Sequence, residues 1–504
     1  MNAGREINLK GQQKMKRFIT LLLLAAMLVS CGSGTSAEKD TTAGTTDSGT
    51  TDETTAETKT DGLPDVDMDG FVFSVYHHSA DSMHWTNTTL DVESETGEVL
   101  EDSIYRRNRS VEERFNCVIE TSEYNNGEIN STMISKEVMA GDSTYDLWFP
   151  RDYNVAASIP YLRPLNDLPY LDLDADWWFP NASKVFRFND QQWSATSAFS
   201  LSMIARAGGM VFNKNMYDTI GAEKTPYEYV RDNEWTLDTL ASVAKLGYRD
   251  LNGNTELDKE DCFGISGWCK ELYARFLNGS GIRFINTDEN GYPSFDLPSD
   301  QAAIDKMIHI YEIFKDKEIY NNPDSIKKKT SQIDSWGLLK DRTSLFRTSN
   351  PSEMDKECRH FDFDVGFVVC PKYDSSQEEY YSSTWAAEMN VVLKTLPDER
   401  LENVSIILEA LSYSGYHDVV PIYRETTMKG KLAQDTESEE MFDIVLNSMC
   451  FDFGLIVWEG PVADPIIAGI YASNDGNVVS TLAKLECKIN GVIEDLNENL
   501  AAEQ

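Results

Sequence analysis

The sequence FVFSVY, residues 71–76, predicts a buried β-strand, because it is a short apolar run rich in aromatic and β-branched residues. Residues 103–115 carry apolar side chains at helical spacing with a charged outer face, and residues 117–120 form a second strand-like run. A helix over 129–140 and a strand over 145–149 extend the alternation. Strands that alternate with helices predict a parallel sheet, and therefore an α/β fold.

Ligands of parallel sheets bind beyond the carboxyl ends of the strands. His77 and His78 follow the first predicted strand, and residues 150–153 follow the third. We therefore expect both segments at the edge where a ligand binds. A metal site formed with His84 is a weaker interpretation, because no cysteine or carboxylate completes the ligand set.

The rest of the chain shows the same pattern without a convincing internal repeat. Thr236 is placed to cap a helix, because its hydroxyl precedes apolar residues at helical spacing. Further strands are expected over 209–212, 344–346, 365–369 and 385–393, and further helices over 301–314 and 399–411.

The N-terminal residues 1–31 have the features of a bacterial lipoprotein signal peptide. A basic start at 14–17 precedes an apolar stretch at 18–27 that is too short to span a bilayer, and small residues follow Cys31. We expect cleavage before Cys31, lipidation of that cysteine, and an extracytoplasmic protein anchored to the cell membrane by its lipid. An ordinary secretory peptide is the alternative.

Residues 32–62 are dominated by small, polar and acidic residues without an aromatic side chain, which predicts a flexible tether. About 440 residues remain, and the chain is 41% hydrophobic, which is enough for two lobes rather than one core. The formal net charge of −39 argues against nucleic acid and anionic membranes as bulk partners.

The cysteines show no metal-binding or redox motif. Eight are present, and none of the seven that follow Cys31 lies in a Cys-x-x-Cys pair or at zinc spacing. Cys262 and Cys269 could form a disulfide in an oxidising compartment, whereas buried free thiols are the expected state for most of the seven.

The order of several short segments resembles the extracellular solute-binding proteins of ABC importers, specifically carbohydrate-binding family 1, which is similar to maltose-binding protein. The segments are Tyr145-Asp-Leu-Trp148, Arg163-Pro-Leu-Asn-Asp167, Val211-Phe-Asn-Lys214, Glu234-Trp-Thr-Leu237, Asp261-Cys-Phe-Gly-Ile265 and residues 385–411. They cover nearly all of the globular part.

The resemblance implies a type II, periplasmic-binding-protein-like fold of two α/β lobes, with crossing hinge segments and a ligand cleft between the lobes. The implied first lobe takes residues 63–195 and 372–425, and the second takes 196–371 and 426–504. The implied function is capture of a carbohydrate, expected to be an oligosaccharide, and delivery to ABC permease subunits by lobe closure. Such a protein is a monomer, requires no cofactor and is not an enzyme.

Aromatic rings stack on the C–H faces of sugars, while charged side chains can bond their hydroxyls. By position in the resembling family, the segments after Trp148 and Phe346, and the residues Trp268 and Trp385, face the cleft. Each of these could instead be ordinary core. The candidate ligand-binding residues are His77, Trp148, Arg151, Asp152, Tyr153, Trp268, Arg347, Trp385, Glu388 and Trp458.

Residues 250–261 carry oxygen-bearing side chains at the spacing of an EF-hand-like calcium loop. Thr255 stands where the sharp turn favours glycine, and Asp261 replaces the bidentate glutamate. A structural Ca²⁺ and a metal-free acidic turn both stay open. The candidate ligands are Asp250, Asn252, Asn254, Glu256, Asp258 and Asp261.

Two other function classes are weighed against import. The sequence contains no nucleophile elbow, metalloprotease helix, phosphate loop or dinucleotide-binding glycine motif. Asp152 and Glu388 can be nominated as a glycosidase pair, but in so acidic a chain such a pair has little weight. A surface glycan-binding lipoprotein without a transport role is the main alternative, and peptides or other polar ligands stay open.

Overall fold

The computed structural model describes residues 61–79, 89–188, 190–255, 260–288, 291–321, 335–426, 435–472 and 476–502. The predicted signal peptide, including Cys31, and nearly all of the predicted tether lie outside these described residues. Thr60 to Gln504 form one compact unit. Within the described ranges, no helix combines the length and the apolar character that a membrane crossing needs.

In these described ranges, the strands fall into two principal sheets and three short pairs. They are β1 (Phe71–His78), β2 (Cys117–Tyr124), β3 (Leu147–Trp148), β4 (Leu162–Arg163), β5 (Arg187–Phe188), β6 (Gln191–Gln192), β7 (Gly209–Asn213), β8 (Phe263–Ser266), β9 (Asn286–Thr287), β10 (Pro293–Ser294), β11 (Tyr320–Asn321), β12 (Ser344–Ser349), β13 (Val365–Val369) and β14 (Val392–Leu393).

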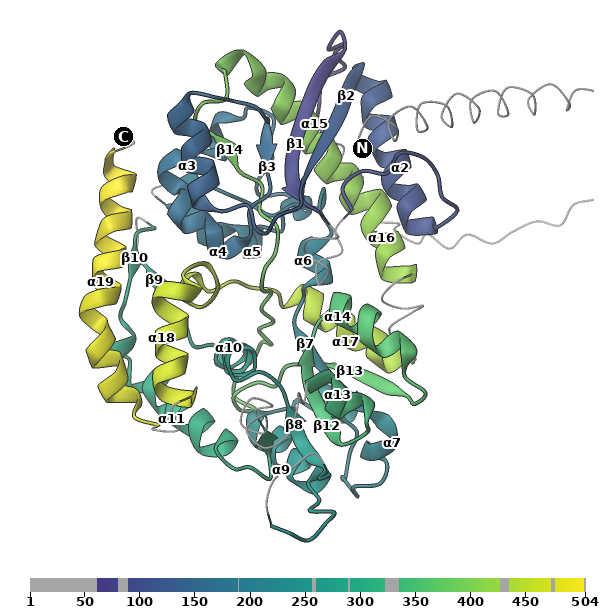
Figure 1. The fold of residues 1–504 in the computed structure, drawn as a ribbon, viewed down its shortest axis with the longest axis vertical. Coiled ribbons are helices and arrows are strands. Elements are labelled where there is room, and N and C mark those ends of the chain that lie inside the picture. Colours follow the sequence, from purple (N-terminus) through teal and green to yellow (C-terminus); the bar gives the residue numbers. More distant parts are fainter. Residues whose placement is uncertain are drawn as a thin grey trace, which may run out of the picture. The chain divides into compact units, whose positions relative to one another are not determined.

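The helices cover these sheets and form the C-terminal part of the chain (Figure 1). They are α2 (Val99–Phe115), α3 (Ser131–Ala140), α4 (Asp152–Val155), α5 (Pro180–Ser183), α6 (Ser202–Ala205), α7 (Lys214–Tyr217), α8 (Pro226–Arg231), α9 (Leu237–Gly247), α10 (Cys269–Gly279), α11 (Gln301–Phe314), α13 (Ser335–Lys340), α14 (Pro351–Glu357), α15 (Leu401–Ser414), α16 (Val420–Tyr423), α17 (Thr436–Asn447), α18 (Asp464–Ile467) and α19 (Val478–Ala502).

The first lobe is built on a sheet in which β1 lies between β2 and β3. Both neighbours run parallel to β1, as the sequence predicts, with Phe71 opposite Cys117 and Val75 opposite Leu147. Phe73 and Val75 are fully buried beneath α2 and α15, which pack beside β1 and β2 (Figure 1). The alternating apolar residues of FVFSVY therefore supply the core of this lobe.

The second lobe is built on a five-stranded sheet of order β11-β8-β12-β7-β13. β8 runs parallel to β11 and β12, but β7 runs antiparallel to β12 and β13. The repeated strand-helix pattern therefore overpredicts parallel pairing here. The reason is topological. The chain enters the lobe through β7 and leaves it through β13, and the first residue of β7, Gly209, lies opposite the last residue of β13, Val369. The two strands must therefore run in opposite directions.

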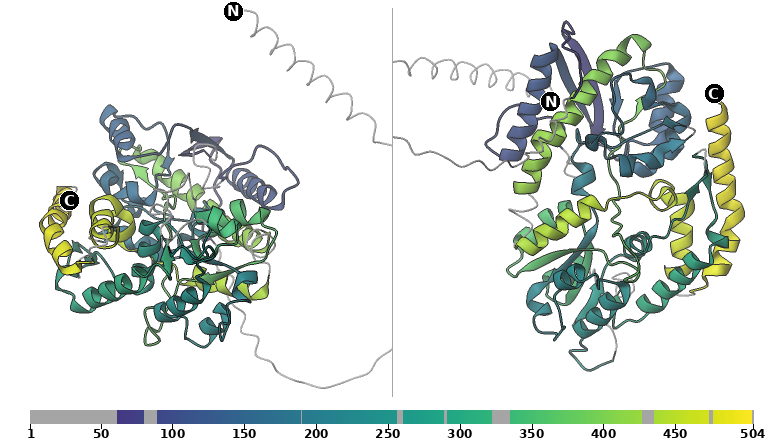
Figure 2. Two further views of the ribbon diagram at one scale, coloured as in Figure 1. Left: turned by 60° about the horizontal axis from the view of Figure 1, so that its bottom comes forward. Right: turned by 180° about the vertical axis from the view of Figure 1, so that it is seen from behind.

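The C-terminal helix α19 packs against α11 and the β9-β10 pair, and also contacts the first lobe at 156–161. Figure 2 shows this helix in yellow beside the teal β9-β10 segment. The lobe boundaries drawn from the sequence stay a prediction.

Several sequence-predicted elements match the structure, and one does not. The predicted helix at 301–314 and strand at 365–369 have the bounds of α11 and β13. Thr236 caps α9 by accepting a hydrogen bond from the Thr239 N–H at 3.3 Å. The strand predicted over 385–393 is reduced to β14 and isolated bridges, because Ala386 adopts a φ of +62° that interrupts extended structure.

The seven cysteines that follow Cys31 are all free thiols. The disulfide considered between Cys262 and Cys269 is therefore not formed. Burial raises the pKa of the Cys117 thiol to about 11 and those of Cys358 and Cys370 to about 12. These three cysteines serve as small apolar core residues.

A buried carboxylate ties a loop to the first lobe. The indole N–H groups of Trp177 and Trp178 donate to Glu409 on α15 at 2.7 and 2.8 Å, and the backbone N–H of Asp172 donates to it at 3.3 Å. Burial raises the pKa of Glu409 to about 7 despite these hydrogen bonds. Trp177 and Trp178 are buried, and this contact packs their segment against the lobe.

Replacing Glu409 with Ala should lower the free energy of unfolding by about 2–5 kcal/mol, because two buried indole N–H groups lose their acceptor. Denaturant unfolding measures the change. Glu402→Ala, at an exposed position of the same helix, is the control and should change stability by less than about 0.5 kcal/mol. Equal effects of the two substitutions would contradict a stabilising role for the hydrogen bonds that Glu409 accepts.

Candidate functional site

Two chain segments, residues 195–208 and residues 383–391, cross between the lobes side by side. At one end, the Asn390 N–H donates to the Ala195 carbonyl at 2.7 Å, and the side chain of Asn390 donates to the same carbonyl at 2.9 Å. At the other end, the Gly208 N–H donates to the Ser383 carbonyl at 3.0 Å. We call residues 383–391 the crossing segment. It joins the first lobe where Val391 pairs with Trp148 of β3.

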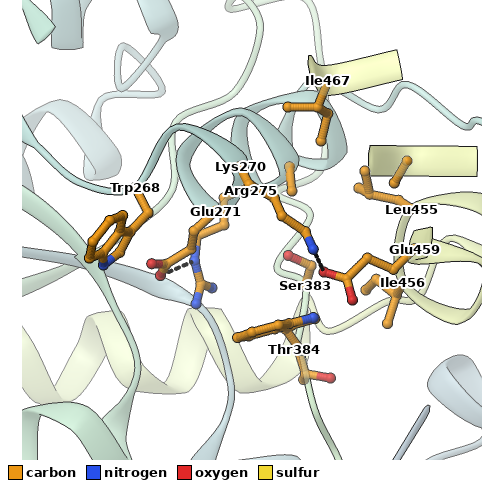
Figure 3. Close-up of a pocket in the computed structure, with 13 residues that line it drawn as sticks. Trp268, Lys270, Glu271, Arg275, Ser383, Thr384, Leu455, Ile456, Glu459 and Ile467 are labelled. Carbon is orange, nitrogen blue, oxygen red and sulfur yellow. Dashed lines mark hydrogen bonds and ion pairs between the residues drawn. The ribbon is translucent and has the colours of Figure 1, made fainter. Parts of the chain in front are cut away.

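A pocket opens beside the crossing segment, with about 680 Å³ of empty space that includes volume open to solvent. Its walls come from α10, the crossing segment and the chain from 455 to 467 (Figure 3). The lining residues are Trp268, Lys270, Glu271, Ala274, Arg275, Ser383, Thr384, Trp385, Leu455, Ile456, Glu459, Ala463 and Ile467.

Two tryptophan rings line this pocket and remain open to solvent. Trp268 is 36% exposed and Trp385 is 42% exposed, whereas most large aromatic residues of the described chain are buried. The ring of Trp385 lies 5.9 Å from both Lys270 Nζ and Arg206 Cζ, and 6.3 Å from the ring of Tyr153. Exposed indole faces in a concave site are suited to stacking on the C–H face of a sugar.

The position of Trp385 is set by the backbone around it. Arg206 Nε donates to the Trp385 carbonyl at 2.9 Å, and Arg151 Nη1 donates to the Ala386 carbonyl at 2.9 Å. The Asp152 carboxylate accepts from the Ala387 N–H at 3.1 Å. These contacts hold Ala386 in its left-handed conformation, which is unusual for a residue with a Cβ.

An ion-paired group forms one wall of the pocket. Lys270 pairs with Glu459 and, at 2.8 Å, with Asp464, and the indole of Trp385 hydrogen-bonds to Glu459. Burial raises the pKa of Glu459, although Lys270 opposes the shift. For Lys270, burial alone would lower the pKa, but its two carboxylate partners outweigh burial and raise it.

A second charged network lies behind the crossing segment. Glu388 Oε1 lies 3.7 Å from both Arg151 Nη1 and His78 Nδ1, and its other oxygen accepts from the Ser200 hydroxyl at 2.9 Å. The Ile129 N–H donates to His78 Nε2, so that the neutral ring carries its proton on Nδ1, facing Glu388. All three charged or titratable side chains are almost fully buried.

The pKa values follow from this burial and pairing. For Glu388, burial alone would raise the pKa, but His78 and the Arg151 guanidinium lower it to about 2. Burial lowers the pKa of His78. Asp152 shows the reverse of Glu388: burial raises its pKa to about 7. The network holds the crossing segment through a carboxylate that stays ionised at neutral pH.

Polar groups also gather at the carboxyl ends of β8 and β12. Arg347 Nη1 donates to Glu353 at 3.0 Å, and Arg206 and Arg275 add to the positive potential that lowers the pKa of Glu353 against its burial. Arg275 itself pairs with Glu271 at 3.2 Å on the pocket wall. The hydroxyls of Ser266 and Thr348 are buried here without a hydrogen-bond partner among the described residues.

The structure separates the sequence-predicted ligand residues into two groups. Trp268 and Trp385 line the pocket. The other candidates are buried or half-buried and are not among its lining residues: His77, Trp148, Arg151, Asp152, Tyr153, Arg347, Glu388 and Trp458. Arg151 and Asp152 instead contact the crossing segment, of which Glu388 is part, and a direct ligand role for this second group stays a prediction.

The acidic loop is only partly described, because Glu256 and Asp258 lie outside the described residues. Asp250 accepts from the Gly253 and Thr255 N–H groups at 2.7 and 2.9 Å, and Thr255 has a φ of +61°. Thr255 thus takes the left-handed conformation for which glycine is favoured. In the described part of the chain, no cluster of three metal-ligating side chains is formed, and calcium binding stays a prediction.

Sequence reasoning missed the pocket wall formed by 455–467. Residues 453–458 are a continuous apolar run, which alone indicates only burial. Lys270 and Glu459 are far apart in the sequence and are ordinary surface residue types. Their pairing beside Trp385 becomes visible only once α10 and the C-terminal segment are packed together.

Neither a protein-family model nor a curated protein matches the chain. Among solved structures, a cyclic α-maltosyl-1,6-maltose binding protein from Arthrobacter globiformis is 12% identical, with 84% of this chain and 100% of that chain covered and a TM-score of 0.54. An uncharacterized protein from Listeria monocytogenes EGD-e is 11% identical, with coverage of 84% and 100% and a TM-score of 0.53.

A third similar structure is an ABC transporter associated binding protein from B. animalis subsp. lactis Bl-04 in complex with β-1,6-galactobiose. It is 11% identical, with 84% of this chain and 98% of that chain covered and a TM-score of 0.50. The chain has the two-lobed α/β fold of ABC substrate-binding proteins. This confirms, at the level of the fold, the predicted resemblance to the maltose-binding-protein-like family.

Replacing Glu388 with Gln should lower the free energy of unfolding by about 3 kcal/mol at pH 7, because it removes the carboxylate beside the buried Arg151 guanidinium. The folded-state pKa of Glu388 is depressed to about 2. Its stabilising contribution is therefore present above about pH 4.5 and is lost as the pH falls towards 2.

The difference between wild type and Glu388→Gln should therefore shrink between pH 5 and pH 3. Denaturant unfolding at pH 7, 5 and 3 measures it, with Glu402→Gln on exposed α15 surface as the control. A difference that stays constant over this range would show that ionisation of Glu388 does not support the crossing segment.

Proposed function

We propose that this chain is a lipid-anchored solute-binding protein that captures a carbohydrate, an oligosaccharide in particular, and delivers it to an ABC permease. The observation that carries the proposal is the pair of exposed rings, Trp268 and Trp385, in a pocket beside the segments that join two lobes. Flat aromatic faces in such a position favour ligands with stacked C–H surfaces, as sugars have.

The polar groups beside these rings support the same class of ligand. Arg275 and Glu271 on the wall can exchange hydrogen bonds with hydroxyl groups, since one donates and the other accepts. A sugar ring requires both kinds of partner around an apolar face. The named ligands of two proteins with this fold, cyclic maltosyl-maltose and galactobiose, are oligosaccharides, which agrees with the proposal.

Lobe closure provides the mechanism. The described pocket walls belong to the second lobe and the crossing segment, while Tyr153 of the first lobe lies beside Trp385. A ligand that also contacts the first lobe binds the closed arrangement better and shifts the population towards it. The permease then recognises the closed form. Energy and translocation come from the partner subunits.

The membrane anchor is inferred from Cys31 and the apolar stretch before it. The acidic tether then gives the binding domain its reach from the membrane. On this proposal the protein is extracytoplasmic, acts as a monomer and contacts the permease at the membrane surface.

Replacing Trp385 with Ala should weaken binding of the recognised oligosaccharide by about tenfold or more, because the stacking face is lost. Isothermal titration of the purified protein against an oligosaccharide panel measures affinity, and Trp385→Phe, which retains a ring, should recover most of it. Unchanged affinity in Trp385→Ala would remove this pocket from the proposal. Binding of peptides alone, or hydrolysis of the sugars, would replace carbohydrate import with another function.

Replacing Cys31 with Ser should abolish incorporation of labelled palmitate and move the chain from the detergent phase to the aqueous phase in Triton X-114 partition. The reason is that serine offers no thiol for acylation. Cys487→Ser, at an exposed thiol of α19, is the matched control and should keep the label. Label retained by the Cys31 variant would refute the lipoprotein assignment.

A further inference from the structure

The pocket has two chemically different ends. Figure 3 shows Leu455, Ile456 and Ile467 on the side opposite Trp268, grouped around the Lys270–Glu459 ion pair. Ala274 and Ala463 complete the aliphatic wall. Three separate elements, α10, residues 453–457 and α18 with the helical segment 459–463 before it, therefore converge to make one apolar end.

The charged groups near this end are engaged with one another. Lys270 pairs with Glu459 and Asp464, and Glu459 also takes the hydrogen bond of the Trp385 indole. A ligand hydroxyl placed directly against the Leu455 and Ile456 side chains would lose its water without gaining a hydrogen bond from those two residues. Binding of a hydroxyl group against these two side chains is therefore disfavoured.

An apolar group at the same place has the opposite effect. Each buried methylene contributes about 0.8 kcal/mol of transfer free energy, which corresponds to a roughly fourfold gain in affinity. Ala274 and Ala463 keep this end open, because they are the smallest side chains in the wall.

We propose that the ligand is a glycoside that carries a small aryl or alkyl group, with the sugar between the tryptophan rings and the apolar group among Leu455, Ile456 and Ile467. This inference rests on the proposed carbohydrate-binding function and names its substrate class. It assigns the aliphatic wall as the specificity-determining part of the site.

The test compares matched pairs of probes with the purified full-length protein. Methyl and phenyl glycosides of the same sugar, for glucose, galactose, xylose and mannose in both anomeric forms, are titrated by calorimetry. The phenyl glycoside of the recognised sugar should bind at least tenfold tighter than its methyl counterpart. Equal or weaker binding of the phenyl glycoside would overturn the inference and leave the proposed function standing. Binding of no glycoside and no oligosaccharide would overturn both.

The substitution Ala274→Leu tests whether the preference for phenyl glycosides arises at the apolar end of the pocket. Ala274→Leu fills the apolar end from half-exposed α10 surface, and should reduce the phenyl preference to less than threefold while leaving methyl glycoside affinity within about twofold. Ala302→Leu, at an exposed position of α11, makes the same change outside the pocket and should keep the full preference. A preference that survives Ala274→Leu in a protein of unchanged melting temperature would place the apolar group elsewhere. The wild-type comparison decides the proposal even if this variant does not fold.

Discussion

The hydrogen bonds that hold the crossing segment are the constraint on which the site depends. Arg206 and Arg151 approach it from different parts of the chain, and they donate to the carbonyls of Trp385 and Ala386, respectively. Arginine suits this task, because its planar group stays charged and offers several donors in a fixed arrangement. The cost of Ala386 in a left-handed conformation is offset by these contacts, and the result is an indole ring held open to solvent.

The buried carboxylates on the two sides of the pocket have different neighbours and therefore different protonation behaviour. On the first-lobe side, Glu388 is ionised by its neighbours, while Asp152 nearby is driven towards the neutral form. On the second-lobe side, Arg206, Arg275 and Arg347 surround Glu353. The strong negative charge of the whole chain therefore says little about the site, where arginine side chains are concentrated in the interior.

The sequence predicted local elements well where short-range physics decides them. The bounds of α11 and β13 and the cap at Thr236 follow from periodicity and a hydroxyl at the right place. Periodicity failed at 385–391, because partners from two different segments, and not a continuous strand, define its conformation. Burial of Arg151 beside Glu388, and the wall around Glu459, result from contacts between distant parts of the chain, which no local pattern contains. Residue types indicated Trp268 and Trp385 as candidates, but only packing separates exposed indoles from core indoles.

The edge of the first-lobe sheet is covered by a segment made much later in the chain, and this has a consequence for biosynthesis. The strands β1 to β3 end at Trp148, but the edge beside β3 is covered only by Val391 and β14, whereas all five strands of the second sheet lie between 209 and 369. On the ribosome the second sheet is therefore complete before the edge of the first sheet is covered. At 5–20 residues per second, the first sheet waits roughly 10–50 s with an open edge. During that interval the unpaired edge of β3 is available to pair with other chains. The N-terminal lobe is therefore made first but is the last to have its sheet edge covered.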